Sequence, residues 1–233
     1  MTYTRHFIFC MISCISMHAA SPAQDALTTQ RASFYAFEVP AARTSIHLMT
    51  QKNTFIKLDL PGANATAPVT VANPDGNIAI YDQPVTGADG KKTYPLLGKI
   101  TASSQWKEVM VILVAGKNTA SGKEQITGFA FPMSKTDLPP GSIKFANLSP
   151  CLIRGALGNS KLLFKPGVIE TITLDEKSGS MVNVVFQYQD DDAWQRMMAT
   201  QWAAGNQERT LVFAFKNPLS GIMTSRSIPL RDD

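Results

Sequence analysis

The sequence has few of the residues that build catalytic and metal sites. Its 233 residues include three cysteines and three histidines, and only 17% are charged. Cys10 and Cys14 lie in the first 23 residues, so a chain that loses this segment keeps Cys151 alone and can form no internal disulfide. His47 is then also the only histidine, which excludes a histidine-rich metal site. We expect no cofactor, no metal and no catalytic residue set, and a core that supplies the stability.

Concentrated positive charge and long apolar runs are also missing. The formal net charge is +4, and no run of lysine and arginine is interleaved with aromatic residues. Nucleic-acid binding requires such a concentrated patch, so we expect no nucleic-acid partner. After the N-terminal segment no apolar run approaches the about 20 residues that cross a bilayer. We therefore expect no transmembrane segment in the mature chain.

The N-terminal segment has the three blocks of a signal peptide. Arg5 and His6 are followed by an uncharged apolar run over residues 7–17 and then by small residues up to Ala23. This order predicts a signal peptide at residues 1–23 and a secreted protein that is periplasmic or extracellular. Residues 11–14 also loosely match a lipobox, so a lipoprotein anchored at Cys14 is the alternative.

Short strands separated by turns account for most of the remaining chain. Residues 54–60 alternate between apolar and polar side chains, which is typical of a strand with one buried face. Residues 108–115 are apolar at nearly every position, which favours a strand covered on both faces. We find no internal repeat in the residue pattern. Many short strands at this spacing predict β-sandwich modules.

A turn-rich segment divides the chain. Residues 137–141 contain two prolines and a glycine, which cannot continue a central strand. The sequence therefore predicts an all-β protein with two consecutive immunoglobulin-like β-sandwich modules, residues 25–136 and residues 140–233.

One segment of the second module has helical spacing. Trp194, Met198 and Trp202 follow one another at intervals of four residues, and three aspartates precede them. Side chains at this interval share one face of a helix, and aspartate favours a helix N-terminus. We expect a short helix over residues 190–204 with both tryptophans on one face.

Sequences that resemble catalytic or ligand motifs fail on their details. Residues 116–124 resemble a phosphate loop but have five residues between the glycines and a glutamate after the lysine. Residues 104–107 match the S-x-x-K motif of penicillin-recognising enzymes, but its companion motifs are absent. Three adjacent aspartates lack the alternate spacing of a Ca²⁺ loop. We expect Cys151, which precedes Leu152 and Ile153, to be a buried and unreactive thiol.

Several segments resemble a group of exported bacterial proteins without an assigned function. The resemblance rests on residues 138–150, Lys165-Pro166-Gly167, the pair Trp194 and Trp202, residues 209–213 and residues 228–232. It implies a signal peptide followed by two β-rich modules, and it implies no activity. Residues 143–157 are also similar to the opening of the second domain of periplasmic pilus chaperones, although their basic anchor residues have no match here.

These observations favour an exported, non-catalytic binding or structural protein whose ligand the sequence does not identify. Its partner would be a cell-envelope protein or a glycan. One alternative is a carbohydrate-binding module that uses Trp194 and Trp202, because exposed tryptophans stack on sugar rings. Another is a cell-envelope hydrolase with two carboxylates in a cleft. A chaperone-like protein of the periplasm is a further alternative.

Overall fold

The structure is a computed structural model that describes residues 28–39, 42–62, 64–118, 121–173, 179–203, 208–217 and 220–230. Its described elements are strands, apart from the single-turn 3-10 helix η1 (Pro74–Gly76), so the predicted all-β class is confirmed. The expected signal peptide, its cleavage site and Cys14 lie outside the described residues. Among the described residues no helix has the length and apolar character that a membrane crossing requires.

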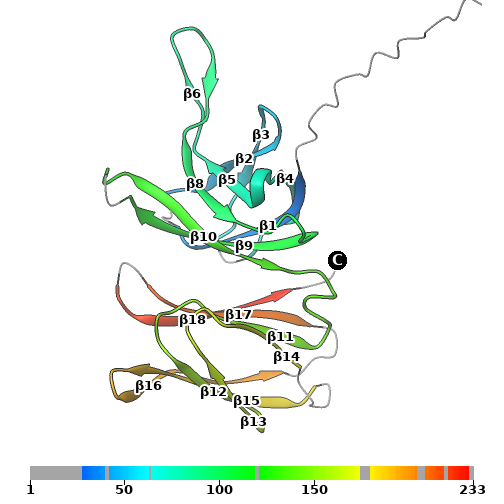
Figure 1. Ribbon diagram of the computed structural model, residues 1–233, viewed down its shortest axis with the longest axis vertical. Helices are drawn as coiled ribbons and strands as arrows, with labels where there is room; N and C mark the ends of the chain where they lie inside the picture. Colours follow the sequence, from blue (N-terminus) through cyan, green and yellow to red (C-terminus); the bar gives the residue numbers. More distant parts are fainter. Residues whose placement is uncertain are drawn as a thin grey trace, which may run out of the picture.

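The first ten strands, which we call the first module, form two facing sheets of four strands each and one separate hairpin. The first inner sheet has the order β10-β9-β1-β4, and the first outer sheet has the order β3-β2-β5-β8. Strands β6 and β7 pair only with each other, in a hairpin that projects from the body (Figure 1). The strands are β1 (Thr29–Glu38), β2 (Ser45–Gln51), β3 (Thr54–Asp59), β4 (Val69–Ala72), β5 (Asn77–Tyr81), β6 (Val85–Thr86), β7 (Lys92–Thr93), β8 (Leu96–Thr101), β9 (Glu108–Lys117) and β10 (Glu124–Pro132).

The remaining strands form the second module, which also consists of two facing sheets. The second inner sheet has the order β14-β11-β17-β18, and the second outer sheet has the order β13-β12-β15-β16. The strands are β11 (Ser142–Asn147), β12 (Ile153–Leu157), β13 (Ser160–Phe164), β14 (Ile169–Thr173), β15 (Met181–Asp190), β16 (Ala193–Ala203), β17 (Arg209–Lys216) and β18 (Met223–Leu230).

The two modules share one topology. In the first inner sheet, β1 lies between β4, which is antiparallel to it, and β9, which is parallel to it. In the second inner sheet, β11 likewise lies between the antiparallel β14 and the parallel β17. The outer sheets correspond as well, because the order β3-β2-β5 in the first matches the order β13-β12-β15 in the second. A Pro-Gly pair, at Pro61-Gly62 and Pro166-Gly167, also follows the third strand of each. The chain is therefore a tandem repeat of one strand order, which the residue pattern did not reveal.

The four sheets stack as four layers, with the two inner sheets in contact (Figure 1). On β9, Val109 and Val111 face the core of the first module, whereas Met110 and Ile112 face the second module and pack with Phe213. A strand between two apolar layers needs apolar residues on both sides. The predicted central strand is thus confirmed, and contact between the modules explains why neither of its faces is polar.

Two basic side chains hold the connection between the modules. Lys144 on β11 donates from Nζ to the carbonyl oxygen of Pro132 at 3.0 Å. Arg209 on β17 donates from Nη1 to the carbonyl oxygen of Met133 at 2.8 Å. Both residues are buried, at 5% and 8% exposure, and burial lowers the pKa of Lys144. Buried cations that bind main-chain carbonyls fix the path of the chain from β10 into the second module.

The predicted helix over residues 190–204 is wrong, because this segment is the second strand of a hairpin. Strands β15 and β16 pair antiparallel from Met181 with Ala203 to Asp190 with Ala193. Asp191 takes a positive φ of 49° in the two-residue turn. Aspartate tolerates this conformation, which tight hairpin turns require. A spacing of four residues fits a strand as well as a helix, since every second residue of a strand shares a face.

Candidate functional site

The structure places the two candidate tryptophans on opposite sides of the second outer sheet. A β-bulge in β16 leaves Met197 unpaired, because Phe186 pairs with Met198 and the next residue, Gln187, pairs with Arg196. The extra residue reverses the alternation of side chains. Trp202 therefore packs against the second core, while Trp194 lies on the solvent side with Arg154. The prediction of one shared face is wrong for this reason.

The solvent side of the second outer sheet, which we call the basic face, has an unusual composition. Three residues are cationic, four carry amide side chains, and one is Trp194. Among the described residues of these strands the only acid is Asp190. Side chains alternate along β15, so Asp190 lies on the opposite side of the sheet from Gln189 and from the basic face. Asp191 and Asp192 lie in the turn next to Trp194. The basic face consists of Arg154, Ala156, Lys161, Leu163, Met181, Asn183, Val185, Gln187, Gln189, Trp194, Arg196, Ala199, Gln201 and Ala203.

Arg154 and Trp194 form the centre of the basic face. The guanidinium carbon of Arg154 lies 4.2 Å from the centroid of the Trp194 ring, which is a close cation–π contact. Its Nε donates to the Oε1 of Gln187 at 2.7 Å. Arg154 is therefore oriented by two neighbours while its side chain remains exposed. A guanidinium held in this way retains terminal N–H groups that can bind an anion.

A shallow hollow lies beside this pair. It has a volume of about 250 Å³ and runs between Arg154 and Lys161 over the small residues Gly155 and Ala156. Further along the sheet, Gln201 donates from Nε2 to the Oδ1 of Asn183 at 2.9 Å. The face thus combines positive charge, oriented amides and an aromatic ring on one side of a four-stranded sheet.

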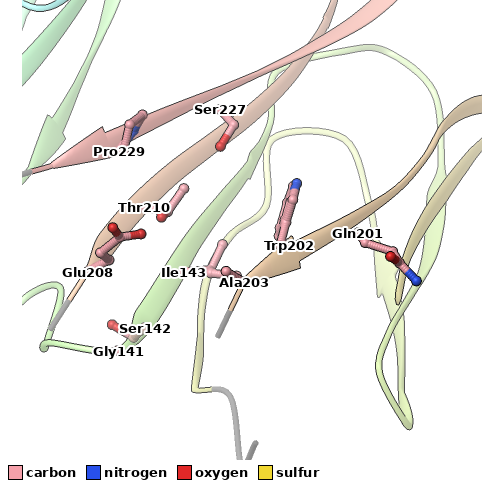
Figure 2. Close-up of a pocket in the computed structure, with 10 residues that line it drawn as sticks. All are labelled: Gly141, Ser142, Ile143, Gln201, Trp202, Ala203, Glu208, Thr210, Ser227 and Pro229. Atoms are coloured by element: carbon pink, nitrogen blue, oxygen red, sulfur yellow. The ribbon is translucent and has the colours of Figure 1, made fainter. Parts of the chain in front are cut away.

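Trp202 lies at a second site, a pocket of about 240 Å³ between the edges of β16 and β18 (Figure 2). The indole forms one wall, and Glu208, Thr210 and Ser227 lie across from it. The sequence singled out Trp202 as a ligand candidate, and the structure does place it on a cavity. The sequence did not indicate Glu208, because the fold alone brings it opposite the indole.

Carboxylates near a cavity in the first module have an environment that opposes acid catalysis. Asp82 and Glu124 both bind Arg43, which donates to Asp82 Oδ1 at 2.7 Å and to Glu124 Oε2 at 3.0 Å. The hydrogen bond from Arg43 lowers the pKa of Asp82. A glycosidase general acid requires the reverse, a raised pKa. This ion-pair group links the start of β10 to the segments that precede β2 and follow β5, and we interpret it as a structural contact.

His47 and Cys151 are separate from both sites of the second module. His47 is 7% exposed on β2 and packs beside Tyr94, with ring centroids 5.3 Å apart. Burial is the main cause of a lowered pKa for His47, and the charge of Lys57 adds to it. Cys151 is only partly buried at the edge of the second core, so it is less enclosed than the sequence predicted.

No group of three or more His, Cys, Asp or Glu side chains in the described part of the chain has the arrangement of a metal site. No protein-family model matches the sequence, and no curated protein matches it either.

Proposed function

We propose that the protein is an exported, non-catalytic binding protein whose basic face binds an acidic polysaccharide of the cell envelope. The observation that carries this proposal is the charge of the basic face. Arg154, Lys161 and Arg196 project from three different strands, and none of the four described strands places a carboxylate among them. Such a face attracts a polyanion.

The remaining side chains of the basic face favour a sugar polymer over other polyanions. Asn183, Gln187, Gln189 and Gln201 each carry an amide, which donates and accepts hydrogen bonds and so suits hydroxyl groups. Trp194 offers an aromatic surface to the C–H groups of a sugar ring. Arg154 covers one side of the indole, so a sugar ring would use the other. Single-stranded nucleic acid usually meets several stacking aromatics, and this face has one.

Retention in native gels that contain a polysaccharide tests the proposal. Polygalacturonate is the acidic polymer, dextran is the neutral comparison, and single-stranded DNA is the competing polyanion. We expect polygalacturonate to retard the protein, dextran to leave its migration unchanged, and added salt to weaken the effect because exposed charges are screened over about 8–10 Å at physiological ionic strength.

Arg154→Gln is the decisive variant, because it removes the charge and keeps a side chain of hydrogen-bonding type. We expect it to weaken retention about tenfold, which corresponds to the loss of one good charge-assisted contact. Lys99→Gln is the matched control, since Lys99 is an exposed cation on the first outer sheet. Equal effects of the two variants would contradict the proposal, as would equal binding of single-stranded DNA and polygalacturonate.

A further inference from the structure

The Trp202 pocket exists because the second module stays open where the first module closes. In the first module, the outer edge strand β8 lies against the inner edge strand β10, so closely that a Cβ on Gly98 would overlap the carbonyl oxygen of Ile126. The corresponding strands of the second module are β16 and β18. They are joined by the hydrogen bond from Ser225 Oγ to Met198 Sδ at 3.8 Å, and the pocket opens beyond it at Trp202.

The lining of the pocket is negative and aromatic. Glu208 is the only charged residue among the described residues that line it, and its side chain is exposed. Thr210 and Ser227 add hydroxyl groups on the same side as Glu208, and the indole of Trp202 stands opposite them (Figure 2). The neighbouring cation, Arg209, is buried toward Met133 and so lies on the other side of β17. Among the described residues, none that lines the pocket therefore neutralises Glu208.

We propose that the Trp202 pocket binds an ammonium group. An aromatic face and a carboxylate are the two features that attract an organic cation, because the ring quadrupole and the negative charge act together. The hydroxyls of Thr210 and Ser227 offer acceptors for the N–H groups. The volume of about 240 Å³ is below the 300–1,000 Å³ of typical ligand pockets, so the site suits one substituent or one sugar ring.

The charge of the Trp202 pocket is opposite to that of the basic face, so the two sites select different ligands although Gln201 borders both. The ammonium group could belong to an amino sugar or to a lysine side chain, since both present the same cation. Glucosamine and Nα-acetyl-lysine amide are the two probes that represent these sources. N-acetylglucosamine and glucose are the matched neutral probes, because they keep the ring and lack the charge.

Fluorescence titration of Trp202 tests this inference in a chain that carries Trp106→Phe and Trp194→Phe, so that Trp202 is the only tryptophan and can be excited selectively. We expect a saturable change with at least one of the two ammonium probes, and binding about tenfold weaker for the neutral sugars. Binding of glucosamine alone would identify an amino sugar as the source, and binding of the lysine derivative alone would identify a polypeptide.

Glu208→Gln removes the charge and keeps the shape of the side chain. We expect it to weaken ammonium binding about tenfold. Glu170→Gln is the control, because Glu170 is an exposed acid on β14 that does not line the pocket. The inference is overturned if neither ammonium probe gives a saturable change, if neutral and charged sugars bind equally, or if the two variants behave alike.

Discussion

Phe37 of the first module and Phe215 of the second meet edge to face, with ring centroids 4.4 Å apart and an interplanar angle of 79°. Phe37 also contacts Phe213 in the same way, at 5.2 Å. These rings belong to the apolar cluster that joins the two inner sheets. The contact between the modules is thus built like a domain core, so we expect the two modules to unfold as one cooperative unit.

Truncating a ring in this cluster should therefore weaken both modules. We expect Phe213→Ala to lower the free energy of unfolding by about 3–5 kcal/mol, the range for removing a buried aromatic side chain. Phe213 is 1% exposed. Urea unfolding, followed in separate single-tryptophan variants that keep Trp106 or Trp202, should show the same shift in each module. Leu163→Ala is the control, because Leu163 is 56% exposed and its loss should change stability by less than about 0.5 kcal/mol. A shift confined to the Trp202 reporter would contradict the coupling.

The sequence predicted the fold class and many strands because local alternation determines them. Residues 54–60 became β3 (Thr54–Asp59), and the doubly apolar residues 108–115 lie within β9 (Glu108–Lys117). It could not predict which surface covers the second face of β9. That surface belongs to β17 and β18, about a hundred residues later, and only the tertiary arrangement of strands brings them together.

The candidate site was predictable only in part. Trp194 and Trp202 could be singled out as aromatic residues, but their separation depends on the bulge at Met197, which has no local sequence signal. Arg154 contacts Trp194 across two strand pairings that span forty residues. The small number of acids on the four strands of the second outer sheet would have indicated a basic surface. The sequence alone does not show which strands form that sheet, because strand order depends on the tertiary fold.

The two tryptophans should differ in stability and accessibility. Trp202 packs on the second core, so we expect Trp202→Ala to cost about 2–4 kcal/mol, somewhat below the range for a fully buried tryptophan. Trp194→Ala should cost less than about 1 kcal/mol, since the ring is on the solvent side. Urea unfolding measures both variants. In single-tryptophan chains, a soluble quencher should act more strongly on Trp194, and equal quenching would contradict the assignment of opposite faces.

Gly98 should be intolerant of any side chain. A Cβ at this position would overlap the carbonyl oxygen of Ile126 where β8 meets β10. We expect Gly98→Ala to destabilise the protein by about 1–3 kcal/mol, because relief requires the two edges to separate. Gly62→Ala is the matched control, since no atom lies within 4 Å of its added Cβ and the change should be small. Thermal unfolding of both variants measures the difference, and similar melting temperatures would contradict the close approach of the edges.

His47 should make the protein less stable in mild acid. Its Nδ1 has no hydrogen-bond partner among the described residues, and Lys57 is its neighbour on β3. Burial and the charge of Lys57 lower the pKa of His47 below its ordinary 6.5, while the charge of Asp82 acts weakly in the other direction. The unfolded chain therefore binds a proton more readily than the folded chain. Stability from neutral His47 is fully present above about pH 6.5 and decreases as the pH falls toward the folded pKa.

Two variants test the role of His47 in urea unfolding between about pH 5 and 8. His6 and His18 lie in the expected signal peptide, so a chain without it has no other histidine to titrate in this range. We expect His47→Gln to remove most of the pH dependence. Lys57→Gln should reduce it, because the pKa of His47 would move back toward its ordinary value. Lys99→Gln, a cation that does not pair with His47, should leave the dependence intact. An unchanged pH profile in His47→Gln would show that the dependence arises elsewhere in the chain.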